Sequence, residues 1–389
     1  MRDNSARRVR FIPVVVIFVL LAFLAAGTAS NLERNPQPGL VAEGIPGQKV
    51  PAATSAHLPS QYEGMVRQAL ADLDTLTLPG GATLAGWDGP WRFVWPRDAS
   101  FVAAARCSVG QYAEASSVLS FLNRVRPASG RWAARYAVDG SVPADGREPQ
   151  LDGSGWVLWA SWFCSGGLDL SVYWPMLRES GDQIVAELGP DGLPAVSADY
   201  WERPESSVTL GTVAPLLAGL RAGLAIAGRL GHEVPSWQGA LDRLSAATDR
   251  AFGPDYPRTP GGGADAIVTI LGPPFGPPRA DVADAIDHTL GVLTQPNGGV
   301  TPGEEWRADG VAWTPQTTLF ALSSAARGDR ATAESLLSWL DSHRTRTGAI
   351  PEKVNRDLQP AGEAPLGWTS ALVILTAAAL DKPLPVPAA

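Results

Sequence analysis

The pattern of apolar and polar positions is helical from about residue 59 to the C-terminus. Almost no stretch alternates with a period of two, and Gly- and Pro-rich segments separate the stretches of helical character. About twelve helices are predicted, over residues 59–76, 97–108, 111–126, 153–165, 169–188, 208–228, 236–252, 263–271, 282–293, 314–327, 330–343 and 367–380. We therefore expect an all-α body, in which segments 263–271 and 282–293 are the weakest helices.

Two of these segments differ in how much of their circumference is apolar. Segment 236–252 has one apolar face and an opposite face of charged and amide residues, which predicts an outer helix. Segment 208–228 is apolar around most of its circumference and rich in glycine, which predicts an inner helix whose start is delayed, or whose axis is kinked, at Pro215. About twelve antiparallel helices that alternate between these two types predict two concentric rings, an (α/α)₆ barrel.

The N-terminus has the pattern of an export segment. Several arginines precede an unbroken apolar run over residues 11–27, so we expect residues 1–30 to be either a cleaved signal peptide or a membrane anchor. In both cases the arginines place the rest of the chain outside the cytoplasm. Residues 31–58 are a Pro-rich linker, and residues 59–389 form the folded domain. The predicted location is therefore extracytoplasmic, secreted or anchored to the membrane by residues 11–27.

Charge and cysteine content narrow the classes of function. The formal net charge is -8, which disfavours a nucleic-acid partner and suits an uncharged or weakly charged substrate. Cys107 and Cys164 are too few for a disulfide framework or a thiolate zinc cluster, and they either pair or are buried separately. The sequence has no HExxH, no GxSxG, no Walker loop and no GxGxxG opening a helix after a strand. We expect no cofactor and assign no metal-binding residue, and a calcium site stays open.

Several loops place carboxylates beside aromatic or other pocket-forming residues. They are Trp-Pro-Arg-Asp at 95–98, Gln-Leu-Asp-Gly at 150–153, Asp-Tyr-Trp-Glu-Arg at 199–203, Glu-Glu-Trp at 304–306 and Ile-Pro-Glu-Lys at 350–353. A pyranose ring has apolar C–H faces that stack on indole, and hydroxyls that need fixed charged or amide partners. The chain holds 14 tryptophans, so this combination indicates a sugar-binding site.

In this order the motifs resemble those of glycoside hydrolase family 15, which contains glucoamylases, glucodextranases and bacterial trehalase-like enzymes. The resemblance covers about residues 60–382. Segment 95–98 resembles the Arg-Asp motif at the subsite for the non-reducing-end sugar, and segment 150–153 resembles the pocket segment that follows it. The resemblance implies that substrate is bound by Trp95, Arg97, Asp98, Asp152, Trp201 and Trp368. We expect Arg203, which directly follows Glu202, to contact substrate as well.

The same resemblance implies the chemistry. Trp201-Glu202 is similar to the pair that bears the general acid, and Pro351-Glu352 to the pair that bears the general base. Segment 365–371 resembles the start of the last inner helix. The implied activity is inverting, exo-acting hydrolysis of an α-glucoside, in which the two carboxyl groups are about 6.5–9.5 Å apart. Two features depart from the family: Arg203 stands where fungal members have a second Glu, and segment 31–58 is too short for the β-sandwich of many bacterial members.

Structural roles stay open for several of these residues. Asp98 also suits the first turn of a helix that begins at Pro96, and Asp152 suits an N-cap. Glu352 could form an ion pair within its loop with Lys353 or Arg356. The negative charge of Glu205 could stabilise the N-terminus of the helix that starts near residue 208, through the helix dipole. Burial beside Trp201 and Tyr200 favours the protonated form that an acid needs, so we expect Arg203 to point away from Glu202 or toward substrate.

Two other classes of function also fit the sequence. One is a catalytically silent carbohydrate-binding or cell-envelope protein on the same barrel, and the other is an inverting disaccharide phosphorylase. The expected partner is an oligosaccharide or polysaccharide, with no nucleic acid and with membrane contact only through the N-terminal segment. The glycan and its linkage stay open, because one fold serves many substrates.

Overall fold

Helices dominate the residues that this computed structural model describes, which are 62–128 and 130–387. The α-helices are α2 (Glu63–Leu76), α3 (Pro96–Ser108), α4 (Tyr112–Val125), α5 (Asp152–Phe163), α6 (Trp174–Glu187), α7 (Leu210–Leu230), α8 (Pro235–Phe252), α9 (Ala280–Leu293), α10 (Thr314–Arg327), α11 (Arg330–Ser342) and α12 (Gly367–Asp381). The all-α prediction is confirmed for this part of the chain. The export segment 1–30 and linker 31–58 lie outside the described residues.

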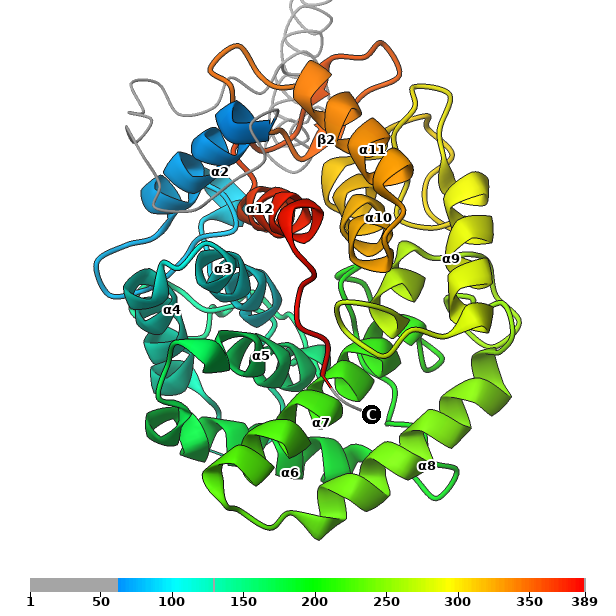
Figure 1. The fold of residues 1–389 in the computed structure, drawn as a ribbon. Helices are drawn as coiled ribbons and strands as arrows, with labels where there is room; N and C mark the ends of the chain where they lie inside the picture. Colours follow the sequence, from blue (N-terminus) through cyan, green and yellow to red (C-terminus); the bar gives the residue numbers. More distant parts are fainter. Residues whose placement is uncertain (1–61, 129, 388–389) are drawn as a thin grey trace, which may run out of the picture. The chain divides into compact units, whose positions relative to one another are not determined.

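The helices form two concentric rings (Figure 1). The inner ring runs α3, α5, α7, the 3-10 segment η5 (Ala266–Leu271), α10 and α12, and α12 packs on α3 to close it. Helices α4, α6, α8, α9 and α11 each pack outside the inner element that precedes them, and α2 packs outside α12. The predicted (α/α)₆ barrel is confirmed.

The predicted helix 263–271 is wrong in type and start. Only residues 266–271 are helical, and they form the 3-10 segment η5, which begins after Asp265 accepts a hydrogen bond from Ile267 N at 2.9 Å. The segment is rich in β-branched residues, and Gly272-Pro273-Pro274 follows it at once, so an α-helix cannot continue. A short 3-10 turn thus fills one of the six inner positions.

Burial separates the two rings as the sequence pattern predicts. Every residue of α12 from Gly367 to Leu380 is buried, whereas α8 buries only one stripe and exposes the rest. Pro215 lies inside α7, and its carbonyl oxygen would be 2.1 Å from a Cβ at Gly155 of α5, so only glycine permits this approach. Helix α7 is long and apolar enough to cross a membrane by length and composition, yet 89% of that window is buried, as in a core helix.

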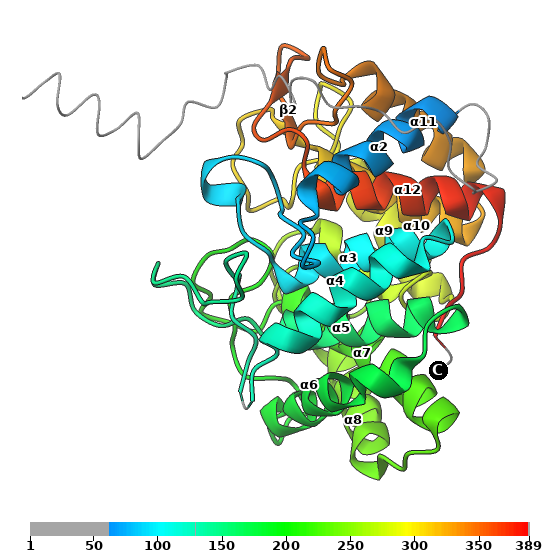
Figure 2. The same cartoon turned by 90° about the vertical axis from the view of Figure 1, so that its left-hand side faces the viewer.

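The inner helices all begin at the same end of the barrel, because inner and outer helices alternate in direction. Long loops precede the inner elements, over residues 77–95, 126–151, 188–209, 253–265, 294–313 and 343–366. At the other end, connections such as 109–111, 231–234 and 328–329 are short. Figure 2 shows the short strand β2 at the loop end and the C-terminal tail leaving at the opposite end. Every motif singled out in the sequence therefore lies at or near the loop end.

Two further connections fix the ring. Strands β1 (Ala312–Trp313), β2 (Lys353–Val354) and β3 (Pro360–Ala361) form an antiparallel sheet in that order, with Trp313 opposite Lys353. This sheet joins the loop before α10 to the loop before α12. Cys107 and Cys164 form a disulfide with a Cα–Cα distance of 5.4 Å, which ties the end of α3 to the end of α5.

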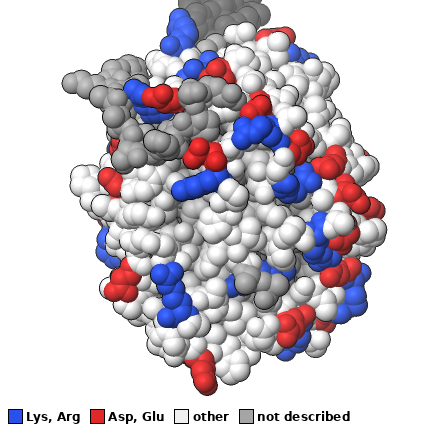
Figure 3. All heavy atoms as spheres, in the orientation of Figure 1, with Lys and Arg blue, Asp and Glu red and all other residues white. Residues whose placement is uncertain are grey.

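The charged side chains on the face seen in Figure 1 are of both signs. Figure 3 shows Lys and Arg interspersed with Asp and Glu on this face, among many uncharged residues. This is the end of the barrel from which the C-terminal tail emerges. The net negative charge of the chain is therefore not gathered there into one region of a single sign.

Candidate active site

A cavity of about 310 Å³ lies at the loop end of the barrel. Both glutamates predicted for catalysis, Glu202 and Glu352, line it. Its aromatic lining consists of Trp91, Trp95, Tyr200, Trp201, Trp306, Trp313 and Trp368, and its other polar lining of Arg97, Asp98, Arg147 and Gln316. Of the predicted substrate-binding residues, Asp152 and Arg203 are absent from this lining.

Arg97 connects the carboxylates on one side of the cavity. Its guanidinium lies 3.0 Å from Asp152 Oδ2 and 3.1 Å from Glu202 Oε1, and its Cζ lies 5.5 Å from the ring centroid of Trp368. Burial alone would lower the pKa of Arg97, but Asp152, Glu202 and Asp98 together raise it above its usual value. Arg97 is therefore a fixed cation against the carboxylates around it.

Of the two aspartates beside Arg97, Asp98 lines the cavity and Asp152 does not. Asp98, in the first turn of α3, lines the cavity, and burial raises its pKa to about 6 although Arg97 acts in the opposite direction. Asp152 lies behind Arg97 and accepts a hydrogen bond from Trp156 Nε1 at 3.1 Å. Burial raises the pKa of Asp152 as well, again against the effect of Arg97. Asp152 is the first residue of α5 and not its N-cap, which is Leu151, so its role is to hold Arg97.

Glu202 sits at a sharp turn of the loop before α7. Its φ is 56°, a left-handed conformation that is unusual for a residue with a side chain, and its N–H donates to Asp199 O at 2.9 Å. Oε1 accepts a hydrogen bond from Gln150 Nε2 at 2.8 Å in addition to that from Arg97, and Oε2 accepts one from Arg147 Nη1. The turn thus directs the carboxylate into the cavity and among these donors.

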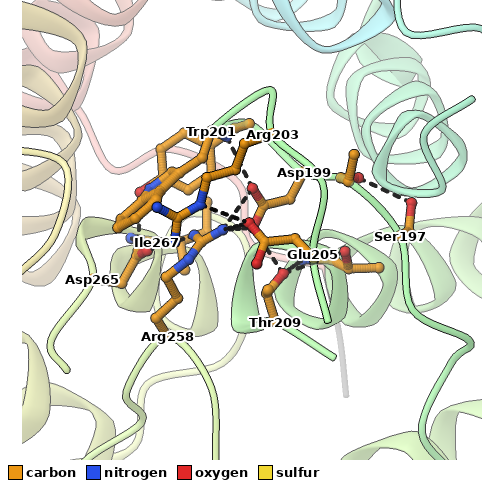
Figure 4. Close-up of polar contacts among 12 residues, drawn as sticks. Ser197, Asp199, Trp201, Arg203, Glu205, Thr209, Arg258, Asp265 and Ile267 are labelled. Atoms are coloured by element: carbon orange, nitrogen blue, oxygen red, sulfur yellow. Dashed lines mark hydrogen bonds and ion pairs between the residues drawn. The ribbon is translucent and has the colours of Figure 1, made fainter. Parts of the chain in front are cut away.

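A second arginine, Arg258, holds the same loop from behind (Figure 4). It is buried and lies 2.9 Å from Asp199, 2.6 Å from Glu205 and 2.9 Å from Asp265. Its Cζ lies 3.6 Å from the ring centroid of Trp201, and the backbone N–H of Trp201 donates to Asp199 Oδ1 at 2.9 Å. The Trp201-Glu202 pair is thereby anchored to the start of η5, which Asp265 caps.

Arg203 lies away from the carboxylate of Glu202. Its Nε is 3.2 Å from Glu205 Oε1, and its Cζ is 4.2 Å from the ring centroid of Trp201 (Figure 4). This position agrees with the expectation that its charge does not face Glu202. The alternative role for Glu205, a charge at the N-terminus of α7, is not what the structure shows. Thr209 caps α7, and Glu205 pairs with Arg258 and Arg203.

Glu352 approaches the cavity from the loop before α12. It is 6% exposed, directly precedes β2, and its carbonyl accepts a hydrogen bond from Thr314 N at 3.0 Å. Lys353 Nζ lies 3.1 Å from Glu352 Oε2 and 4.2 Å from the ring centroid of Trp313. A Cβ at Gly362 would be 2.5 Å from Glu352 Oε2, so the bare glycine makes room for this carboxylate. Glu352 therefore both pairs with Lys353 and lines the cavity.

Four indole groups in the lining offer unused donors. Nε1 of Trp95, Trp201, Trp306 and Trp368 is buried and has no hydrogen-bond partner among the described residues. Gln316 Oε1, an acceptor in the lining, is likewise buried and has no hydrogen-bond partner among the described residues. A buried polar group without a partner costs free energy, and Trp159 Nε1 and Ser323 Oγ, outside this cavity, are further examples among the described residues. What distinguishes this lining is its combination of indole rings with charged side chains, which suits a ligand that has apolar faces and hydroxyls.

Comparisons with known proteins find likeness in structure. A glycosidase solved in complex with glucose is 22% identical, with a TM-score of 0.71 over 83% of this chain and 99% of that one. A glucoamylase from Saccharomycopsis fibuligera is 12% identical, with a TM-score of 0.70 over 87% of this chain and 98% of that one. The fold is glucoamylase-like. A bacterial glucoamylase in complex with acarbose is 16% identical, with a TM-score of 0.65 over 83% of this chain and 56% of that one.

No protein-family model matches this sequence, and a search of curated proteins finds no match. Structures at such low identity establish the glucoamylase-like fold alone.

Sequence reasoning missed two arginines of this glucoamylase-like barrel. Arg147 lines the cavity and bonds Glu202, and only its closeness to the motif at 150–153 could have pointed to it. Arg258 follows Asp255 and Tyr256 in its loop, but these residues match none of the motifs that indicated the site, so no sequence signal marks Arg258. Both act through contacts between segments far apart in the chain.

Proposed function

We propose that this protein is an inverting glycoside hydrolase that removes a terminal sugar from an α-glucoside. One observation carries the proposal: Glu202 and Glu352, from two different loops, line one cavity that six tryptophans also line. The cavity volume of about 310 Å³ is at the lower end of the range for small-molecule sites, which suits the end of a glycan better than the middle of a chain.

The two glutamates have separate roles in this mechanism. Glu352 takes a proton from a water molecule, and the water oxygen bonds to the anomeric carbon on the face opposite the leaving group. Glu202 gives its proton to the glycosidic oxygen as the bond from that oxygen to the anomeric carbon breaks. The leaving group departs as an alcohol, and the released sugar has the inverted configuration.

The remaining lining residues hold the sugar. Arg97 and Asp98 present a fixed donor and a carboxylate at the wall that Arg97 forms with Trp368, where they bind hydroxyls of the terminal ring. The indole rings that line the cavity cover the C–H surfaces of the sugar ring. Asp152 acts from behind, by keeping Arg97 in place.

We also propose that the protein works outside the cytoplasm. The Cys107–Cys164 disulfide supports this location, because disulfides persist in oxidising compartments. The arginine-led apolar run at residues 11–27 supports it independently.

A screen of α-linked glucosides, with the product anomer followed by NMR, tests the hydrolase. We expect release of β-glucose as the first product, and Glu202→Gln and Glu352→Gln should each lower kcat by about 10²–10⁴-fold. Glu114→Gln, on the exposed side of outer helix α4, is the matched control and should keep full activity.

Release of α-glucose as the first product would contradict the inverting mechanism. Turnover that requires inorganic phosphate would point to a phosphorylase, and binding of α-glucosides without any turnover would point to a silent binding protein.

A further inference from the structure

Both carboxylate oxygens of Glu202 are occupied by donors in the structure. Oε1 accepts from Arg97 Nη2 at 3.1 Å and from Gln150 Nε2 at 2.8 Å, and Oε2 accepts from Arg147 Nη1. An acid that protonates a leaving group needs one oxygen that carries the proton and faces that group. One of these contacts therefore has to break before Glu202 can act.

The donors on Oε1 are fixed. Arg97 is 5% exposed and is also bonded to Asp152 at 3.0 Å, and Gln150 is 4% exposed. Moving either one would break other buried contacts, which for Gln150 are with Arg97 Nη1 and Asp199 O, both at 3.4 Å. Oε1 is therefore the oxygen that stays bonded to the protein, and Oε2 is the one that can turn to substrate.

Arg147 is placed to release Oε2. Its side chain is 34% exposed, and it lies in the loop 137–149, which has no helix or strand and is exposed along most of its length. Its Nε also lies 3.7 Å from Asp145 Oδ2, and Asp145 is itself held by Arg135 at 2.6 Å. A guanidinium that leaves Glu202 thus keeps an ionic partner nearby, which lowers the free-energy cost of the movement.

We propose that Arg147 is a positioning residue that controls the proton-donating oxygen of Glu202 and is displaced by the leaving group when substrate binds. This inference rests on the proposed function. In the ligand-free protein Arg147 donates to Oε2 and places its positive charge beside that oxygen. When the leaving group takes its place, Oε2 is free to hold the proton that it will donate.

Other charged groups surround Glu202, but they do not change with Arg147. Arg97 and Asp98 come from α3, and Asp152 comes from the start of α5, and all three interact electrostatically with one another or with Glu202. Their contribution is the same in the wild type and in a variant of Arg147. A difference in pH dependence between the two proteins therefore reports the Arg147 contact.

The test compares pH profiles of Arg147→Gln and the wild type on an α-glucoside that the wild type hydrolyses. The kcat/KM profile reports the free protein, and the kcat profile reports the complex. We expect the alkaline limb of kcat/KM to move up by about one pH unit, the low end of the effect of a neighbouring opposite charge, because Arg97 remains. The alkaline limb of kcat should stay in place, since substrate has already displaced Arg147.

Two further variants complete the design. Arg178→Gln removes an arginine that pairs with Asp182 on the exposed side of outer helix α6, and it should move neither limb. Arg147→Lys keeps the charge but not the planar donor, so it should shift the kcat/KM limb in the same direction by less. It also provides the measurement if the glutamine variant does not fold.

Either of two results would overturn the proposal. Equal movement of both limbs would mean that Arg147 still contacts Glu202 in the complex, and no movement of either limb would mean that the contact has no effect in the free protein. Glu202→Gln, measured in parallel, distinguishes failure of this inference from failure of the proposed function. Full activity of Glu202→Gln would mean that Glu202 is not the general acid, whatever the Arg147 variants show.

Discussion

Replacing Asp98 with asparagine should stabilise the protein at neutral pH while impairing its activity. Burial raises the pKa of Asp98 from 3.8 to about 6, so the folded protein binds this proton more tightly than the unfolded chain does. The resulting stability is fully present below the unfolded pKa and is lost as the pH rises through about 6. A difference of about two pH units in pKa corresponds to roughly 3 kcal/mol at pH 7. Asparagine has nearly the same shape and never ionises, so it avoids that loss.

The measurement is urea unfolding of Asp98→Asn and the wild type at pH 4 and at pH 7. The variant should be more stable than the wild type by about 3 kcal/mol at pH 7, and most of this advantage should disappear at pH 4. Asp242→Asn, on the exposed side of α8, is the control and should stay within about 0.5 kcal/mol of the wild type. The kcat/KM of Asp98→Asn should fall, because its carboxyl lines the cavity. A variant that is less stable at pH 7, or equally shifted at both pH values, would refute the reasoning.

Two more predictions concern stability. Arg258→Met should lower the free energy of unfolding by about 3–5 kcal/mol in urea, because it leaves the buried carboxylates of Asp199 and Asp265 without their cation; an unchanged midpoint would contradict this. The double variant Cys107→Ser/Cys164→Ser should lose about 4 kcal/mol, as expected for a crosslink between residues 57 apart in sequence, and the comparison is the wild type unfolded with its disulfide intact.

Much of the fold could be predicted from local sequence patterns. The predicted helix 314–327 matches α10 at both ends, and most others differ from the structure by a few residues, because apolar periodicity and turn residues act over short distances. The failure at 263–271 has a local cause as well: six residues between Asp265 and Gly272 are too few for an α-helix of ordinary length. The two rings followed from the contrast between all-apolar and one-sided helices.

The candidate site was predictable only where residues form compact motifs. Glu202 and Glu352 stand beside Trp201 and Pro351, and those pairs carry the resemblance that singled them out. The partners of these residues are set by packing instead. Arg147 reaches Glu202 across 55 positions, a contact that depends on how two loops meet above the inner helices. Periodicity and composition carry no information about such a meeting.

Two arginines explain how the strained turn at Glu202 is maintained. A left-handed residue that is not glycine costs about 1–3 kcal/mol, so other contacts have to fix it. Arg97 holds the Glu202 carboxylate from the side of α3, while Arg258 holds Asp199, whose carbonyl accepts the Glu202 N–H, from the side of η5. The loop is thus fastened from two inner elements at once, at its side chain and at its backbone. All inner elements begin at the same end of the barrel. Their first turns and the loops that precede them therefore bring Arg97, Glu202 and Arg258 to the same region.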